Sequence, residues 1–246
     1  MERLQVTERH TFFMKYYLAP MEGLTTYNFR TNWNRCYGGM DKYFTPFISN
    51  RHMNSRERND VLPEHNVGMY TVPQILTNKA EEFLSLAEQL AGYGYHEVNL
   101  NLGCPSGTVV ARNRGAGFLG TPRELEDFLD EVFEKCPLEI SIKTRIGMDY
   151  MDEWAPLLKI YQKFPMKELI IHPRLQKEGY KGTPHLEAFA EAVEALQCPL
   201  CYNGDITSPE TLAHVLEKLP MVDTVMIGRG ILQNPGLLPE LKAAST

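Results

Sequence analysis

The residues best suited to chemistry in this chain stand just after short apolar runs. In Asn101-Leu102-Gly103-Cys104-Pro105 a cysteine lies between a glycine and a proline. A thiol near its ordinary pKa of ~8.5 is largely protonated at neutral pH, so it can donate a proton as a general acid. Proline prevents the segment from continuing as a regular strand. We therefore expect Cys104 to be a catalytic acid in a loop, with a buried structural cysteine as the alternative.

Further polar groups follow other apolar runs. Lys143 ends Ile140-Ser141-Ile142-Lys143, where a cation could stabilise the negative charge of a reduced flavin. Gln74 could hydrogen-bond the polar edge of the same ring, and a solvated loop amide is the alternative. His172 and Arg174 could face a phosphate, a flavin or a base, and a structural histidine stays open.

Two glycine-containing segments near the carboxyl end are suited to bind an anion. Gly228-Arg229-Gly230 follows the last apolar run and precedes a short helix, and Asn203-Gly204-Asp205 follows the run before it. Glycines let the backbone approach an anion, and a helix amino terminus offers free N–H groups. We expect the two segments to form a phosphate site, with simple tight turns as the alternative.

The elements that must position these groups alternate in type. Apolar β-rich runs predict strands at Tyr16–Ala19, Tyr43–Ile48, Gly68–Val72, Glu97–Asn101, Glu139–Thr144, Glu168–His172, Leu200–Asn203 and Thr224–Ile227. Amphipathic stretches predict helices at Tyr27–Tyr37, Ala80–Ala91, Glu124–Lys135, Trp154–Phe164, Leu186–Leu196 and Glu210–Leu219. Ser208 and Thr121 are predicted N-caps, each followed by a proline in the first turn.

This alternation predicts βαβ units and a parallel sheet. Eight strand candidates within 246 residues favour a (β/α)₈ TIM barrel of the α/β class over an open sheet. The active site of such a barrel lies at the carboxyl ends of the strands, where the polar groups stand. We expect residues 14–246 to form the barrel and residues 1–13 to be an N-terminal extension.

Composition excludes several protein classes. The chain has no apolar run long enough to span a bilayer and no signal-peptide pattern, so we expect a cytoplasmic protein without membrane association. The Cys198-Pro199-Leu200-Cys201 pair leads into an apolar strand and lacks a partner pair at zinc spacing. We expect structural cysteines and no metal site. A net charge of −6 argues against nonspecific coating of nucleic acid.

These motifs resemble the tRNA-dihydrouridine synthase family. The resemblance runs from Tyr17-Leu18-Ala19-Pro20-Met21 to Ile227-Gly228-Arg229, and its most specific part is Asn99-Leu100-Asn101-Leu102-Gly103-Cys104-Pro105. It implies a barrel that binds FMN, is reduced by NADPH and reduces the C5–C6 double bond of uridines in tRNA. By the same resemblance, reduced FMN would give hydride from N5 to C6 and Cys104 would protonate C5.

The resemblance also implies roles for individual residues. Asn101 and Arg145 match positions that hold the uracil. The positions that match flavin contacts are Pro20, Met21, Gln74, Lys143, His172, Asn203, Gly204, Asp205, Gly228 and Arg229. A base stacked in folded RNA must be extruded to reach a pocket at the barrel mouth.

Other members of the family continue into a helical domain that helps to clamp tRNA, whereas this chain stops at Thr246. We expect that domain to be absent, which leaves open whether the barrel binds tRNA without it. Local positive charge is expected in mouth loops, at Arg51, Arg56, Arg58, Arg112, Arg114, Arg145, Arg174, Lys177 and Lys181. The alternatives are an FMN barrel that acts on a free pyrimidine, like dihydroorotate dehydrogenase, and a noncatalytic flavin- or RNA-binding barrel.

Overall fold

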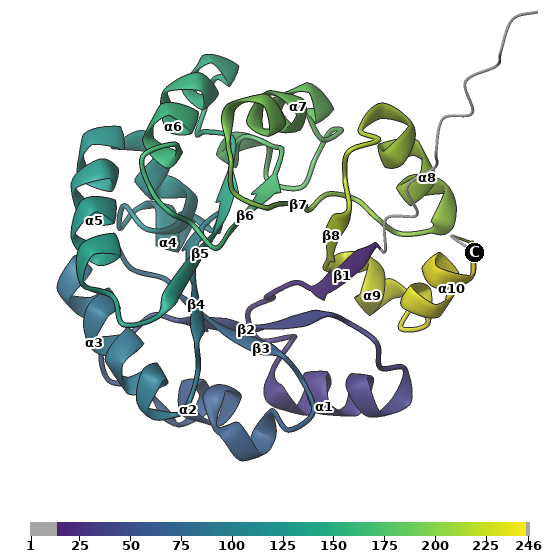
Figure 1. Ribbon diagram of the computed structural model, residues 1–246, viewed down its shortest axis with the longest axis horizontal. Coiled ribbons are helices and arrows are strands. Elements are labelled where there is room, and N and C mark those ends of the chain that lie inside the picture. Colours follow the sequence, from purple (N-terminus) through teal and green to yellow (C-terminus); the bar gives the residue numbers. More distant parts are fainter. Residues whose placement is uncertain (1–13, 245–246) are drawn as a thin grey trace, which may run out of the picture.

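Eight parallel strands close into a barrel in which each strand pairs with its neighbours in sequence and β8 pairs with β1 (Figure 1). The computed structural model describes residues 14–244, so the predicted extension at residues 1–13 lies outside the described residues. The strands are β1 Lys15–Leu18, β2 Lys42–Ile48, β3 Thr71–Ile75, β4 Glu97–Leu102, β5 Glu139–Arg145, β6 Glu168–His172, β7 Leu200–Tyr202 and β8 Thr224–Ile227. The predicted TIM barrel is confirmed.

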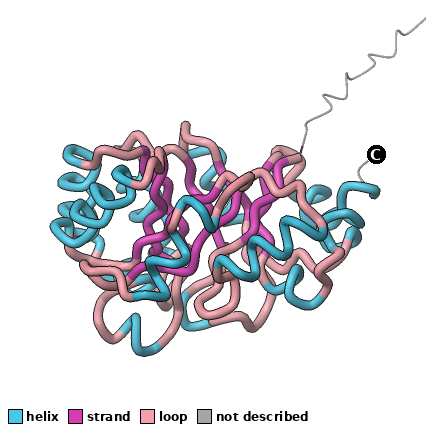
Figure 2. Tube along the Cα trace, turned by 90° about the horizontal axis from the view of Figure 1, so that it is seen from below, coloured by secondary structure: helices cyan, strands magenta, loops and turns pink. Residues whose placement is uncertain are grey.

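Helices surround the barrel and cover the outer face of its sheet (Figures 1 and 2). The α-helices are α1 Tyr27–Cys36, α2 Ser55–Val61, α3 Ala80–Gly92, α4 Gly107–Val110, α5 Pro122–Lys135, α6 Trp154–Tyr161, α7 Leu186–Ala195, α8 Pro209–Lys218, α9 Arg229–Gln233 and α10 Leu237–Ala244. Short 3₁₀ turns are η1 Pro63–His65, η2 Gly115–Gly120, η3 Met151–Glu153 and η4 Gln176–Glu178.

The predicted elements match the observed ones closely except at the third strand. That strand was predicted at Gly68–Val72 and occupies Thr71–Ile75, because the run continues through Pro73 and ends beyond Gln74. The predicted N-cap Ser208 accepts a hydrogen bond from the Thr211 N–H, as expected. Thr121 precedes α5 without capping it, because its hydroxyl bonds instead to Asn113 and the Phe118 carbonyl.

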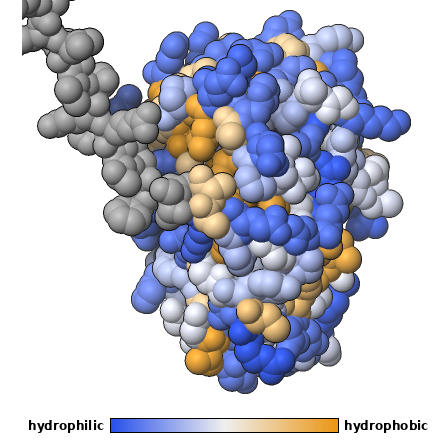
Figure 3. Space-filling view, turned by 90° about the vertical axis from the view of Figure 1, so that its right-hand side faces the viewer, coloured by the Kyte–Doolittle hydropathy of each residue, from blue (hydrophilic) through white to orange (hydrophobic). Residues whose placement is uncertain are grey.

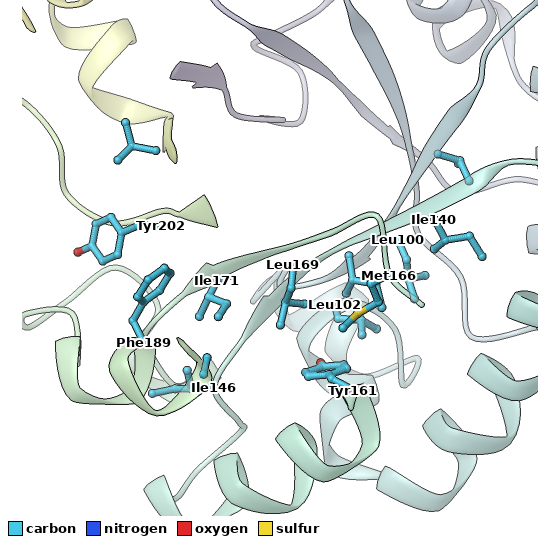
Figure 4. Close-up of a cluster of buried hydrophobic side chains, with 14 of the residues drawn as sticks. Leu100, Leu102, Ile140, Ile146, Tyr161, Met166, Leu169, Ile171, Phe189 and Tyr202 are labelled. Atoms are coloured by element: carbon cyan, nitrogen blue, oxygen red, sulfur yellow. The ribbon is translucent and has the colours of Figure 1, made fainter. Parts of the chain in front are cut away.

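Apolar side chains form two separate layers. Even-numbered residues of β4 and β5, such as Leu100 and Ile142, point outward and pack under the helices. Figure 4 shows side chains of this outer layer on β4, β5 and β6 facing Tyr161 of α6 and Phe189 of α7. A smaller inner cluster fills the barrel and consists of Tyr17, Ala19, Phe44, Val72, Ile170, Cys201 and Met226.

The amino-terminal end of the barrel is closed by a buried ionic network. Lys42 Nζ lies 3.0 Å from Glu97 Oε2 and 3.2 Å from Glu168 Oε2, and the Tyr17 hydroxyl donates to Glu168 Oε1 at 2.8 Å. Burial raises the pKa of Glu168, and Lys42 opposes that rise. Because these paired groups fill this end of the barrel, the space for a ligand lies at the opposite end.

The outer surface is mainly polar. On the face drawn in Figure 3, hydrophilic side chains predominate and hydrophobic ones form small separate groups. Among the described residues, no helix combines the length and the apolar character that crossing a bilayer requires.

Candidate active site

A cavity of about 700 Å³ opens at the carboxyl ends of the strands. This size lies in the range of pockets that hold small molecules and cofactors. The cavity lining includes all of the residues to which the family resemblance gives a site role, namely Pro20, Met21, Gln74, Asn101, Cys104, Lys143, Arg145, His172, Asn203, Gly204, Asp205, Gly228 and Arg229. Residues that are far apart in the sequence are therefore gathered at one place.

The floor of the cavity rests on a chain of amides inside the barrel. Gln74 Nε2 donates to Asn99 Oδ1 at 2.8 Å, and Asn99 Nδ2 donates to Ser141 Oγ at 3.0 Å. Asn101 Nδ2 donates to Gln74 Oε1 at 2.8 Å. The alternative of a solvated loop amide for Gln74 is wrong, because the shifted strand β3 carries this side chain into the barrel, where it is fully buried.

Asn101 also fixes the loop that carries Cys104. Its Oδ1 accepts hydrogen bonds from the N–H groups of Gly103 at 3.0 Å and Cys104 at 2.9 Å. The cysteine is half-buried, and burial raises the pKa of its thiol despite the opposing charges of Lys143 and Arg145. The thiol is therefore protonated at neutral pH, as a general acid requires.

Lys143 is a cation facing the cavity with no bonding partner among the described residues. Its side chain makes no hydrogen bond or ion pair with the residues that the structure describes. Burial, with a further contribution from Arg145, lowers the pKa of its ammonium group to about 8. An electron-rich group bound in the cavity would favour the charged ammonium, because an opposite charge offsets desolvation.

Arg145 bridges two loops of the mouth. Its Nε donates to the Gly103 carbonyl at 2.9 Å, Nη1 to the Leu175 carbonyl at 2.9 Å and Nη2 to the Gly179 carbonyl at 2.7 Å. The side chain thus joins the Cys104 loop to the loop after β6 while still lining the cavity.

Arg174 does not face a ligand, which corrects that part of the prediction. It is fully buried, and its guanidinium bonds to the Lys181 and Gly182 carbonyls and to both carboxylate oxygens of Asp205. It therefore holds the β6 loop against the β7 loop.

His172 lines the cavity as a neutral imidazole. Burial, followed by the charges of Lys143 and nearby guanidinium groups, lowers its pKa well below the ordinary value. Arg174 Nη1 lies 3.1 Å from His172 Nε2, and a guanidinium can only donate. Nε2 therefore accepts, and the ring proton is on Nδ1.

Tyr180 lines the cavity and was missed in the sequence. Its ring stacks on His172 with centroids 6.1 Å apart, and the guanidinium carbons of Arg145 and Arg229 lie 5.4 and 4.6 Å from its centroid. The only local signal was an aromatic residue between Lys177 and Lys181, because the long β6 loop has no regular pattern.

The loops after β7 and β8 approach so closely that they require glycine. A Cβ atom on Gly230, after β8, would lie 2.2 Å from the carbonyl oxygen of Ile206, after β7. Within the β7 segment itself, a Cβ atom on Gly204 would lie 2.7 Å from the Tyr202 hydroxyl. The predicted short helix after Gly228 is α9. Arg229 Nη2 donates to Asp205 Oδ1 at 2.6 Å, which places one guanidinium beside these loops.

The positive charge predicted around the mouth is partly neutralised. Arg51 pairs with Glu81, Arg56 with Glu22, and Arg114 with Glu82. Arg145 and Arg174 are buried and bonded to backbone carbonyls, so they are not available to surface phosphates. Arg58, Arg112, Lys177 and Lys181 form no ion pair within the described part of the chain.

The chain is similar to known proteins over nearly its whole length. A family model described as dihydrouridine synthase matches residues 17–246. A probable tRNA-dihydrouridine synthase of Staphylococcus aureus (strain COL) is 33% identical over 230 residues, which cover 89% of this chain and 68% of the relative.

Two more distant likenesses agree with this result. The tRNA-dihydrouridine synthase B of Pasteurella multocida (strain Pm70) is 28% identical over 223 residues, which cover 90% of this chain and 67% of the relative. Among solved structures, a variant of NCR from Zymomonas mobilis has a TM-score of 0.63 at 13% identity and covers 94% of this chain and 87% of its own. The last likeness concerns the fold alone.

Proposed function

The chain belongs to the dihydrouridine synthase family, and on that premise we propose that it is an FMN-dependent enzyme that reduces uridine to 5,6-dihydrouridine in tRNA. The observation that carries the proposal is a cavity lined jointly by Cys104, Lys143 and the close-packed β7 and β8 loops. The acid, the cation and the candidate phosphate site would then surround one bound cofactor and one substrate. We further propose that residues 14–246 act as one flavin-binding unit.

The residues of the cavity fit FMN on chemical grounds. Lys143 is a cation without a partner among the described residues, as expected beside the N1/O2 edge of a flavin. Gly204, Gly228 and Arg229 would hold the phosphate, and Asp205 would orient Arg229 through their 2.6 Å hydrogen bond. Pro20, Met21, Gln74, His172 and Asn203 would complete the flavin site. Reduced FMN, regenerated with NADPH, would supply hydride from N5 to C6 of the uracil.

Cys104 would supply the proton to C5. Burial keeps its thiol protonated, and Lys143 and Arg145 favour the thiolate that remains after proton transfer. Asn101 holds the loop through the Gly103 and Cys104 N–H groups, so the thiol is positioned before the substrate arrives. Such preorganisation lowers the entropic cost of the reaction.

Asn101 and Arg145 would hold the uracil. One Nδ2 hydrogen of Asn101 and the remaining guanidinium hydrogens of Arg145 are not used in the bonds described above, so they can still donate to uracil carbonyl oxygens. The uridine must leave its stack to enter the cavity. A tRNA substrate also implies a cytoplasmic site of action.

The proposal is tested by the dihydrouridine content of tRNA. Nucleoside mass spectrometry should show lower dihydrouridine in a strain without this gene, and the wild-type gene should restore it. In vitro, FMN-loaded protein with NADPH should form dihydrouridine in unmodified tRNA transcripts. A protein that binds no flavin, or that reduces a free pyrimidine but no tRNA, would refute the proposal and support one of the alternatives.

A further inference from the structure

An exposed aromatic ring and a lysine form a platform on the rim of the mouth. Tyr150, in the loop after β5, is 66% exposed. Lys177 of η4 places its Nζ 4.9 Å from the centroid of the Tyr150 ring. Neither residue lines the cavity. The Tyr150–Lys177 platform therefore lies outside the space where the reaction is proposed to occur.

The loop under the platform is held in one conformation. The Glu153 carboxylate accepts hydrogen bonds from the N–H groups of Met148, Asp149 and Tyr150, the last two at 3.2 Å. Gly147 makes this possible, because its φ is 144° and a Cβ there would lie 2.6 Å from Glu153 Oε2. An exposed tyrosine on such a loop loses little conformational entropy when it binds a partner.

The backbone ties the platform to the loop of the candidate acid. The Lys177 N–H donates to the Met148 carbonyl at 3.1 Å, which joins the β6 loop to the β5 loop. Gln176, next to Lys177, donates from Nε2 to the Pro105 carbonyl at 3.2 Å. Since Pro105 follows Cys104 and Gln176 precedes Lys177, this hydrogen bond links the platform to the segment of the proposed acid. A strand that delivers one base into the cavity must leave its neighbouring nucleotides on this rim.

The unpaired positive charge of the rim lies mainly on the side of the platform. Most rim cations on the side of β2 and β3 are paired with carboxylates, as in Arg51–Glu81, Arg56–Glu22 and Lys79–Glu82, whereas Arg58 after β2 forms no ion pair with described residues. Arg112, Lys177 and Lys181, which follow β4 and β6, form no ion pair with described residues. Phosphates are drawn to unpaired cations. Asp149 and Asp152 are close to Tyr150 in the sequence, and their carboxylates would repel a free anion. A nucleotide that stacks its base on the ring and places a single phosphate at Lys177 suits this charge distribution better.

We propose that the Tyr150–Lys177 platform binds a nucleotide that flanks the target uridine in RNA. The base stacks on the exposed part of the Tyr150 ring, and Lys177 contacts the adjoining phosphate. Aromatic rings bind bases in this way without sequence preference, because every base has a π-face. The inference rests on the proposed function and adds a site for the RNA strand outside the cavity.

The test measures the dissociation constant of FMN-loaded protein for a fluorescent unmodified tRNA transcript over a range of salt concentrations. Tyr150→Ala should raise the dissociation constant at least about fivefold, whereas Tyr150→Phe should stay near wild type. Lys177→Gln should make the plot of log association constant against log salt concentration less steep by about 0.7, which corresponds to the loss of one phosphate contact. The turnover number at saturating tRNA should stay unchanged.

Two matched controls lie away from the mouth. Tyr70 is also half-exposed and has a lysine 5.6 Å from its ring centroid, but it precedes β3 at the amino-terminal end of the barrel. Lys159 is an exposed lysine on the outer helix α6. Tyr70→Ala and Lys159→Gln should leave tRNA affinity and its salt slope unchanged.

The outcomes separate this inference from the function on which it rests. Wild-type protein that binds FMN but neither binds nor reduces tRNA transcripts would overturn the proposed function. Wild-type protein that reduces tRNA, with Tyr150→Ala and Lys177→Gln behaving like the two controls, would overturn the platform alone. Flavin content and melting temperature of each variant show whether it is folded, and rescue by Tyr150→Phe identifies the ring as the binding group.

Discussion

Replacing Asn101 by alanine should weaken the attachment of the loop that carries Cys104 and leave the buried Gln74 Oε1 without a hydrogen-bond donor. The Asn101 side chain accepts from the N–H groups of Gly103 and Cys104 and donates to Gln74 Oε1. Water from the cavity can hydrate the two backbone groups after the substitution, since both residues are partly exposed. It cannot reach the Gln74 oxygen as easily, because that side chain is fully buried.

The cost follows from these three hydrogen bonds. A bond whose partner can be rehydrated is worth about 1 kcal/mol, and a buried group left without a partner costs about 1–3 kcal/mol. Together they predict a loss of roughly 2–4 kcal/mol in the free energy of unfolding, allowing for partial relaxation. For a domain of this size that loss lowers the melting temperature by roughly 5–15 °C.

Asn101→Asp is the matched comparison, because it keeps both acceptor bonds to the loop. The carboxylate cannot donate to Gln74, but the buried amides can reverse. Gln74 and Asn99 would flip so that Gln74 Nε2 donates to the introduced carboxylate, Asn99 Nδ2 donates to Gln74 Oε1, and the Ser141 hydroxyl donates to Asn99 Oδ1. Every group in the chain of amides then keeps a partner. The nearby cations Lys143 and Arg145 offset the added negative charge.

Thermal unfolding with excess FMN measures the stability, and the rate at which Cys104 reacts with iodoacetamide measures the order of its loop. Asn101→Ala should lower the melting temperature and change that rate, whereas Asn101→Asp should melt within a few degrees of wild type. An alanine variant as stable as wild type would refute the argument. So would an aspartate variant that unfolds earlier than the alanine variant.

Three further predictions concern the acid, the cation and the glycine loops. Cys104→Ala should keep its flavin and lose uridine reduction by about 10²- to 10⁴-fold in single-turnover assays, and undiminished turnover would mean that another group is the acid. Lys143 has a folded-state pKa of about 8, below the ordinary ~10.4, because of burial and a neighbouring guanidinium. Between these two pKa values the unfolded chain binds more protons than the folded one, so the free energy of unfolding of FMN-free wild type should rise from about pH 8 to about pH 10, relative to Lys143→Met. Lys143→Met should also bind FMN more weakly. Identical pH profiles of stability for the two proteins would contradict this prediction. Gly230→Ala should lower the free energy of unfolding by roughly 1–3 kcal/mol and weaken FMN binding, because its Cβ would lie 2.2 Å from the Ile206 oxygen. The control Gly236→Ala should be tolerated, because the nearest atom to its Cβ would lie at 3.4 Å. Equal stability of the two variants would count against the close-packed loops.

Much of the fold was predictable because local patterns determine it. Nearly continuous apolar runs such as the one within Glu168–His172 are buried on both faces in parallel sheets, and their alternation with amphipathic helices indicated the barrel. The sequence missed α2, α4 and α10, which are short or lie in loops where periodicity is weak. It also misplaced β3, because a strand through Pro73 resembles a turn in the sequence.

The sequence by itself identified many of the residues that line the candidate site, since the carboxyl ends of barrel strands meet at one mouth wherever the chain folds this way. Only the tertiary structure decided what each side chain contacts. Arg174 and Arg145 look alike in the sequence, yet one is buried against Asp205 and the other lines the cavity. Likewise, Asn101 became an anchor of the Cys104 loop, and Tyr150 met Lys177 across two loops. Such contacts depend on the register and curvature of distant segments, which no local pattern of residues encodes.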